Sequence, residues 1–157
     1  MDLTAHIDGG ARGNPGPAAI GVYIEDADGN PLFEEGKTIG HATNNEAEYR
    51  ALLYLLEIAA TDPVIASFAG GALKIHCDSN LIVQQVLGNW KIKEPRLREL
   101  YDEVQAKKKQ VKLHLRIKHV PREQNKTADA LVNQALDGAV KNGTSKAGAD
   151  KEGFGEL

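Results

Sequence analysis

The stretch that decides the fold is residues 3–17, which read LTAHIDGGARGNPGP. In its first half, the apolar residues Leu3, Ala5 and Ile7 alternate with polar ones, which is typical of a β-strand with one buried face. The strand brings a carboxylate, Asp8, to its C-terminal end, and the glycine- and proline-rich loop that follows is expected to continue neither strand nor helix. A carboxylate beside exposed backbone amides suits the binding of a metal ion and a phosphate.

The remaining sequence predicts four more strands and four helices. The strands are expected at 19–25, 31–38, 72–77 and 111–120. A first helix of roughly fifteen residues is expected to open at Thr43–Asn45 and to end before Asp62, and further helices are expected at 80–87, 95–109 and about 126–138. The Asp28-Gly29 pair indicates a hairpin between the second and third strands. Two strand–helix–strand crossovers after this hairpin predict an α/β fold with a five-stranded mixed sheet, three antiparallel strands then two parallel, flanked by helices.

The composition is that of one soluble domain. A chain of 157 residues with 41% hydrophobic and 26% charged residues supports a single core. We expect the domain to span 1–137 and a glycine-rich tail, anchored at most by Phe154 and Leu157, to span 138–157. The single cysteine, Cys77, excludes a disulfide framework within the chain and a cysteine zinc site. No signal peptide or membrane span is evident, which predicts a cytoplasmic protein without membrane contact.

The net charge of −3 is unevenly distributed along the chain. Residues 91–126 hold twelve of the nineteen Lys and Arg residues against five acidic ones, so this segment is about +7 and the rest about −10. Such a division indicates contact with a polyanion on one side. A solvated helix face around residues 107–109 explains part of the positive charge equally well.

Two acidic residues at the start of the first helix are separated by their spacing. Glu48 shares the helical stripe of Leu52, Leu55 and Ala59, which faces the core, and a carboxylate there needs a cation or hydrogen bonds. Glu46 falls on a wetter stripe, where an acid in the first turn favours the helix dipole. Glu48 is therefore the candidate functional residue, although a buried ion pair is an alternative for it.

Three later residues complete a candidate site. Asp78 follows an apolar strand as Asp8 does, and ligands of open α/β sheets collect beyond the carboxyl ends of strands. Asp129 lies in the first turn of the last helix, and His119 ends the fifth strand, where it can move protons. Structural roles, a helix cap for Asp78 and a dipole contact for Asp129, remain open for each residue alone. Four carboxylates suit Mg²⁺ or Mn²⁺, and two such ions about 4 Å apart catalyse phosphodiester cleavage.

Together these motifs resemble type-I ribonuclease H over about residues 2–136. The matching segments are Ile7–Gly10, Gly13–Gly16, Thr43–Leu52, Cys77–Ser79, His119–Asn125 and Ala128–Leu131. The resemblance implies cleavage of the RNA strand of RNA/DNA hybrids to 3′-hydroxyl and 5′-phosphate ends, with little sequence preference. It assigns the catalytic, metal-binding carboxylates to Asp8, Glu48, Asp78 and Asp129, and a mobile proton-transferring histidine to His119. We expect two Mg²⁺ ions, with Mn²⁺ also active, and a monomer.

The resemblance also implies a substrate-binding surface. It places contacts to the hybrid at Gly9, Gly10, Asn14, Thr43, Asn44, Asn45 and Asn125. Trp90, with Lys91 and Lys93, resembles the family's aromatic contact to the DNA strand, although Trp90 can equally be a packing anchor. The sequence passes from Trp90 directly into the next helix, which resembles the members that lack a separate basic handle.

Two other functions are compatible with this pattern. One is a non-catalytic module that binds hybrids, although four carboxylates beside phosphates would weaken such binding. The other is a DNA nuclease or integrase with the same fold and a similar acidic cluster. The Asn44-Asn45 pair and the Gly9-Gly10 turn favour recognition of a hybrid, because amides can reach the 2′-hydroxyls that only RNA carries.

Overall fold

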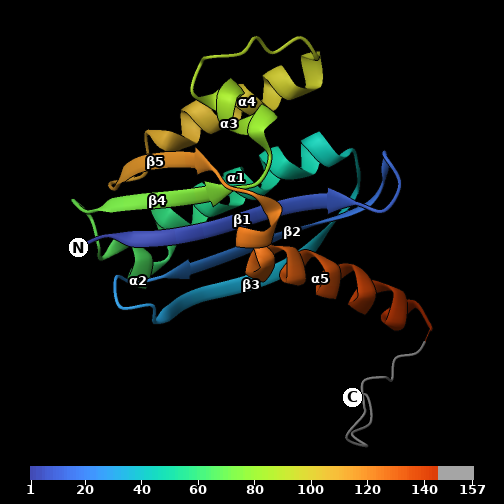
Figure 1. The fold of residues 1–157 in the computed structure, drawn as a ribbon, viewed down its shortest axis with the longest axis horizontal. Helices are drawn as coiled ribbons and strands as arrows, with labels where there is room; N and C mark the ends of the chain where they lie inside the picture. Colours follow the sequence, from blue (N-terminus) through green and yellow to red (C-terminus); the bar gives the residue numbers. More distant parts are fainter. Residues whose placement is uncertain (145–157) are drawn as a thin grey trace, which may run out of the picture.

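The predicted strands and helices all occur in the predicted order, with one additional short helix, and the computed structural model describes residues 1–144 (Figure 1). The five strands are β1 (Leu3–Ala11), β2 (Gly16–Glu25), β3 (Pro31–Ala42), β4 (Ala72–Cys77) and β5 (His114–His119). The helices are α1 (Asn44–Thr61), α2 (Pro63–Ala66), α3 (Asn80–Val86), α4 (Pro95–Lys108) and α5 (Lys126–Thr144), with a 3₁₀ turn at Arg122–Gln124. No helix within residues 1–144 has the length and apolarity needed to cross a bilayer.

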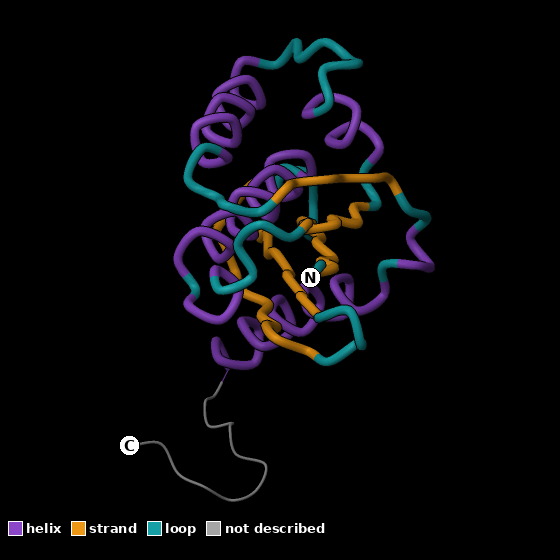
Figure 2. The backbone as a smooth tube through the Cα atoms, turned by 90° about the vertical axis from the view of Figure 1, so that its left-hand side faces the viewer, coloured by secondary structure: helices purple, strands orange, loops and turns teal. Residues whose placement is uncertain are grey.

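The sheet has the strand order β3-β2-β1-β4-β5. Strands β1, β2 and β3 pair antiparallel, whereas β4 pairs parallel to β1 and β5 parallel to β4. This arrangement confirms the predicted mixed sheet. In a view turned by 90°, the strands lie in the middle of the molecule with helical segments on both sides (Figure 2).

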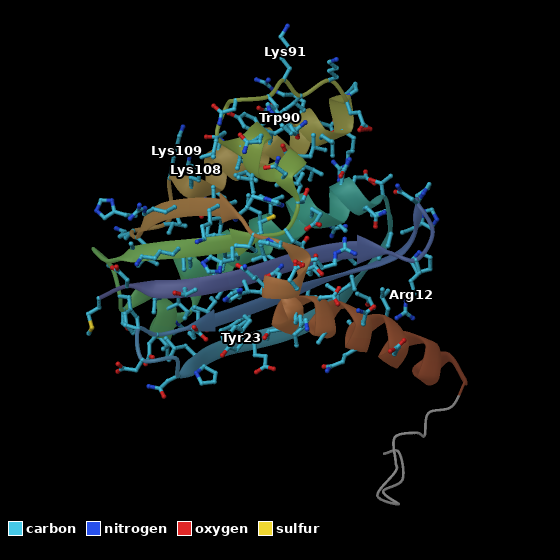
Figure 3. All side chains as sticks on the ribbon, in the orientation of Figure 1. Arg12, Tyr23, Trp90, Lys91, Lys108 and Lys109 are labelled. Carbon is cyan, nitrogen blue, oxygen red and sulfur yellow. The ribbon has the colours of Figure 1, made fainter. Side chains whose placement is uncertain are left out.

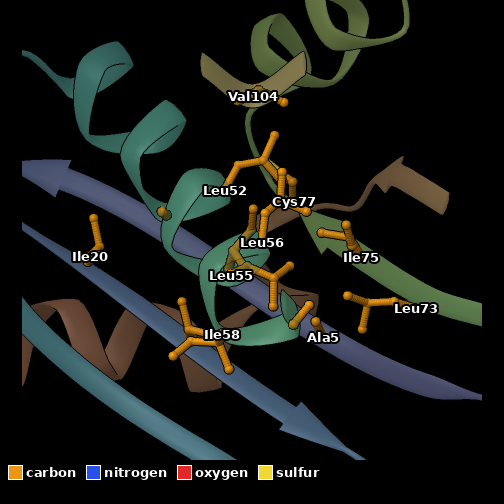
Figure 4. Close-up of a cluster of buried hydrophobic side chains, with 14 of the residues drawn as sticks. Ala5, Ile20, Leu52, Leu55, Leu56, Ile58, Leu73, Ile75, Cys77 and Val104 are labelled. Carbon is orange, nitrogen blue, oxygen red and sulfur yellow. The ribbon is translucent and has the colours of Figure 1, made fainter. Parts of the chain in front are cut away.

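The main core lies between the sheet and α1. Leu52, Leu55 and Leu56 of α1 pack on the inward side chains of β1 and β4, and Val104 of α4 closes the cluster from above (Figure 4). All of these α1 leucines are buried, as the helical stripe containing Glu48 predicts. Burial of a leucine side chain contributes about 1.5–3 kcal/mol, so α1 is fixed firmly against the sheet and holds the residues on its inner face in place.

Helix α5 covers the opposite face of the sheet, over β2 and β3. Val132 and Leu136 pack on Ala19 there. The close approach depends on Gly21, because a Cβ at this position would meet the backbone carbonyl of Ala128 and the side chain of Leu131. The sheet therefore lies between α1 and α5, and both helices begin near the same end of β1 (Figure 1).

Several element boundaries differ from those predicted. β1 includes the first residues of the expected loop and ends at Ala11, because its antiparallel pairing with β2 continues to the Ala11–Ala18 pair. β2 likewise starts earlier and β3 ends later than predicted, whereas β5 is shorter, at His114–His119. The short helix α2 was not predicted, although Asp62 caps it and Pro63 occupies its first turn.

The last helix was predicted to end by Gly138, and this prediction is wrong. α5 continues to Thr144, because a helical glycine lowers stability only by about 1 kcal/mol and does not by itself end a helix. The expected tail at 138–157 therefore begins with helix. Phe154 and Leu157, its expected anchors, lie outside the described residues.

Candidate active site

Asp8 and Asp78 are brought together by the parallel register of β1 and β4. Ile7 pairs with Cys77, so the two aspartates follow at the same level on neighbouring strands. Asp8 was predicted to end its strand, but β1 continues beyond it. Asp8 instead follows the last residue of β1 that pairs with β4. The two chains part beyond this point, and β4 gives way to α3, which Ser79 caps by accepting a hydrogen bond from the backbone N–H of Ile82.

Glu48 reaches the same place from α1. The helix starts with a capping box, in which the Thr43 hydroxyl accepts from the Glu46 N–H and the Glu46 carboxylate accepts from the Thr43 N–H. Glu48 lies on the buried side of the helix, and its Oε1 accepts a hydrogen bond of 3.1 Å from the backbone N–H of Gly9. Only glycine fits at position 9, because a Cβ there would clash with the backbone of Ala47.

Asp8, Glu48 and Asp78 form a tight cluster of carboxylates. One oxygen from each lies within 4.8 Å of the other two. Burial, and then the neighbouring charges of Asp78 and Asp129, raise the pKa of Asp8 to about 8. Burial and the charges of Asp8 and Asp78 likewise raise the pKa of Glu48 well above its usual value. The folded protein thus holds three carboxyl groups close together, and a bound cation can offset the electrostatic repulsion between their charged forms.

Asp129, the fourth predicted carboxylate, is not part of this cluster. It lines the same hollow of about 430 Å³ as the other three residues, from the first turn of α5. Its Oδ2 accepts from the side-chain amide of Asn133 at 3.4 Å. The structure therefore brings together three of the four predicted carboxylates and places the fourth on the wall of the hollow.

His119 was predicted as a site residue, whereas Arg122 was not. His119 pairs with Cys77 at the end of β5, one residue before the level of Asp78, but its side chain is exposed and does not line the hollow. Arg122 does line it, and its positive charge lowers the pKa values of Asp8 and Glu48. Arg122 was not predicted as a site residue. It lies in an irregular 3₁₀ turn, and no periodic pattern in the sequence indicates that its side chain points toward the carboxylates.

The predicted substrate-binding residues fall into two groups. Gly9, Gly10, Asn44 and Asn45 line the hollow beside the carboxylates. Asn14 lies next to them on the β1–β2 loop. Its side-chain oxygen accepts from the Asn44 N–H, and the Asn44 side chain in turn accepts from the Ala11 N–H. These bonds fix the loop against the start of α1.

The second group lies outside the hollow. Trp90, 46% exposed, belongs with Lys91 and Lys93 to the connection between α3 and α4, and Lys91 extends away from the body of the protein (Figure 3). The buried amide of Gln85 donates to the Lys91 carbonyl and anchors this connection. Thr43 caps α1. Asn125 is only 1% exposed, and its side chain points to Ile7 and Asp78.

Glu46 and Glu48 have different structural environments, and this difference is testable. Changing Glu46 to Ala removes one half of the capping box and its ion pair with Arg96, and should lower the free energy of unfolding by about 1 kcal/mol. The activity of the site should stay within about twofold of wild type, because Glu46 does not line the hollow. Urea unfolding and a steady-state assay measure the two effects, and a large loss of kcat would contradict the assignment.

The carboxylate cluster fits a divalent cation. The donors are hard carboxylate oxygens, which Mg²⁺ and Mn²⁺ prefer. Asp78 Oδ1 is buried and has no hydrogen-bond partner among the described residues, as a ligand oxygen waiting for a cation would be. Asp8, Glu48 and Asp78 are therefore the residues that would hold the metal, with Asp129 available from the wall of the hollow.

A mixed sheet in the order 3-2-1-4-5, with acidic residues gathered where its first and fourth strands part, is the arrangement of a ribonuclease H-like protein. Comparison with known proteins agrees. A family described as reverse transcriptase-like matches residues 6–135. Ribonuclease HI of Halobacterium salinarum is 43% identical over 136 residues, 86% of this chain and 64% of that protein. The chain belongs to the type 1 ribonuclease H family.

Other relatives extend this comparison. A bifunctional protein of Mycobacterium tuberculosis is 40% identical over 148 residues, covering 94% of this chain and 39% of its own length. The chain thus spans less than two thirds of these curated relatives. The crystal structure of RNase H1 from Halobacterium salinarum superposes with a TM-score of 0.78 at 40% identity, covering 88% of this chain and 99% of that one. LC11-RNase H1, solved in complex with an RNA/DNA hybrid, gives 0.82 at 43% identity and the same coverage.

Proposed function

We propose that this protein is a ribonuclease H that hydrolyses the RNA strand of RNA/DNA hybrids, leaving 3′-hydroxyl and 5′-phosphate ends. The observation that carries the proposal is the cluster of Asp8, Glu48 and Asp78, whose carboxylate oxygens lie within 4.8 Å of one another. Such a cluster is unfavourable unless protons or cations neutralise part of its charge. The similarity to an RNase H1 solved with a hybrid supports the choice of substrate.

Together with Asp129, the three carboxylates would hold two Mg²⁺ ions, which Mn²⁺ could replace. Bound there, the ions supply an activated water and charge stabilisation for the leaving oxygen. The chain's own residues fix the geometry. Asp8 and Asp78 are set by the parallel strands, and Glu48 is oriented by the Gly9 N–H. His119, exposed at the end of β5, shuttles protons or assists product release from the edge of the site.

The substrate lies across the hollow and the start of α1. The exposed side chain of Asn44, with Asn14 and Asn45, presents amides to the shallow minor groove, where the 2′-hydroxyls of RNA are accessible. Gly9 and Gly10 let the backbone approach, and Thr43 lies where a DNA phosphate would pass the helix N-terminus. Contacts to sugars and phosphates give little sequence preference.

The DNA strand extends toward the connection between α3 and α4. Trp90 offers a half-exposed ring to a base or deoxyribose, and Lys91 and Lys93 offer positive charge to phosphates. This contact provides the affinity that members with a basic handle obtain from a separate insertion.

Changing Trp90 to Ala should raise KM for the hybrid about tenfold, since stacking contributes about 1–3 kcal/mol per base, and should leave kcat unchanged.

The catalytic unit is the domain at 1–137, which acts as a monomer in the cytoplasm. All side chains that line the hollow lie between Asp8 and Leu136. The buried Cys77 thiol, whose pKa burial raises, needs no disulfide partner. Removing residues 145–157 should therefore leave kcat and KM for the hybrid unchanged.

The substrate assay tests this proposal directly. Labelled hybrid, duplex DNA, duplex RNA and single-stranded RNA are incubated with the protein in Mg²⁺, Mn²⁺ or EDTA. We expect metal-dependent cleavage of the RNA in the hybrid, and far slower reaction of the other substrates. Cleavage of duplex DNA in preference would identify a DNA nuclease instead. Tight binding of the hybrid without cleavage in either metal would identify a binding module.

A further inference from the structure

Asn125 stands at a junction of three elements that carry carboxylates. Its side-chain amide nitrogen donates to the Ile7 carbonyl at 2.8 Å, next to Asp8 on β1, and to Asp78 Oδ2 at 3.2 Å, beyond β4. Its own backbone carbonyl accepts from the Asp129 N–H and so forms the first hydrogen bond of α5. One residue thus connects the supports of Asp8, Asp78 and Asp129.

The orientation of this amide follows from its partners. Both atoms that the amide nitrogen faces, the Ile7 carbonyl oxygen and Asp78 Oδ2, are acceptors. Turned the other way round, the amide would set its oxygen against two acceptors and lose both bonds. Asn125 therefore uses its two N–H groups to hold the carboxylate of Asp78 against β1.

The hydrogen bond also gives the two carboxylate oxygens of Asp78 different roles. Oδ2 is occupied by Asn125, whereas Oδ1 is buried and lacks a hydrogen-bond partner within the described part of the chain. A hydrogen bond to a carboxylate oxygen from a fixed donor restricts the rotation of that carboxylate and is stronger than one between neutral groups. The bond thus orients Asp78 so that Oδ1 is free to bind a cation.

We propose that Asn125 is a positioning residue for metal binding, which acts through Asp78 and does not touch the nucleic acid. This inference rests on the proposed function, because it concerns one of the proposed metal ligands. Its burial supports the distinction, since a side chain that is 1% exposed has no surface to offer a sugar or a base. Residues that orient metal ligands typically change metal affinity or activity by 10- to 100-fold when they are replaced.

The test uses Asn125→Leu, which keeps the branched shape of the side chain but has no N–H group. Mn²⁺ binding is measured by calorimetry without nucleic acid, hybrid binding by fluorescence anisotropy in EDTA, and stability by thermal unfolding. We expect Mn²⁺ affinity and kcat to fall about 10- to 100-fold, and the affinity for the hybrid to stay within about twofold of wild type.

Gln85→Leu is the matched control. Gln85 is also a buried amide with two hydrogen bonds, one accepted from the Tyr49 hydroxyl and one donated to the Lys91 carbonyl, but it lies outside the carboxylate cluster. It should lower the melting temperature as Asn125→Leu does and leave Mn²⁺ affinity unchanged. Unchanged Mn²⁺ affinity in Asn125→Leu, or a large loss of hybrid affinity, would overturn the inference. Because Mn²⁺ binding is measured without substrate, a wild-type protein that binds Mn²⁺ but does not cut the hybrid would overturn the proposed function alone.

Discussion

Replacing Asp8 by Asn should lower kcat for hybrid cleavage by at least about 10³-fold, which corresponds to about 4 kcal/mol of transition-state stabilisation. Asp8 lies next to both Glu48 and Asp78 and projects from the strand at the centre of the sheet. The substitution keeps the volume of the side chain and removes the charge that binds the cation. Affinity for the hybrid, measured by fluorescence anisotropy in EDTA, should be retained or improved, because one negative charge beside the phosphates is removed.

The control is Glu46→Gln, which changes an acid two positions from Glu48 on the same helix but outside the hollow. Glutamine can still complete the capping box, so kcat should remain near that of wild type. If Asp8→Asn retains more than about a tenth of wild-type kcat, the three carboxylates do not carry the reaction. A melting temperature well below wild type would show that the loss of activity reflects unfolding.

Replacing Glu48 by Gln should stabilise the metal-free protein and should also abolish hybrid cleavage. Burial and the charges of Asp8 and Asp78 raise the pKa of Glu48 in the folded state. Above the ordinary carboxyl pKa, the unfolded chain releases this proton while the folded chain retains it, so wild-type stability falls as the pH rises toward the raised pKa. Glutamine has no proton to lose and can still accept from the Gly9 N–H.

The expected result is a melting temperature about 5 °C higher than wild type at pH 8, which corresponds to about 2 kcal/mol in a chain of this size, and a smaller difference at pH 5. Mn²⁺ should raise the melting temperature of wild type, because a ligand that binds only the folded state stabilises it, and should raise that of Glu48→Gln much less. A substitution that destabilises the protein at pH 8, or a pH-independent difference, would contradict the electrostatic account. Thermal unfolding in EDTA and in Mn²⁺ at both pH values provides these data.

The sequence predicted those features that depend on local patterns. The alternation of Leu3, Ala5 and Ile7 predicted β1, and the stripe from Glu48 through Leu52 predicted the buried face of α1. Both predictions are confirmed, because side chains that alternate in a strand or recur on one face of a helix must choose between core and solvent in any fold. The pairing of β1 with β4 was not predicted; the structure shows them as parallel neighbours, and their register brings Asp8 and Asp78 together.

Features that depend on partners distant in sequence were not predictable. β1 extends to Ala11 because its residues up to this point pair with β2, although Gly9 and Gly10 indicate a loop when the sequence is considered alone. Asp129 lies on the wall of the hollow and outside the cluster because it projects from the first turn of α5, whose position is set by packing on β1, β2 and β3. The inward direction of Arg122 depends on the 3₁₀ turn before α5. None of these contacts leaves a periodic signal in the sequence.

The most direct test of the central claim is the position of a bound metal ion. Crystals of the protein grown with Mn²⁺ give an anomalous signal that locates the ion without reference to the surrounding protein. The account predicts a peak about 2.0–2.2 Å from carboxylate oxygens of Asp8, Glu48 and Asp78, at the distance typical of such small divalent ions. Saturating Mn²⁺ with no peak in the hollow, or a peak only at other acidic residues, would contradict it.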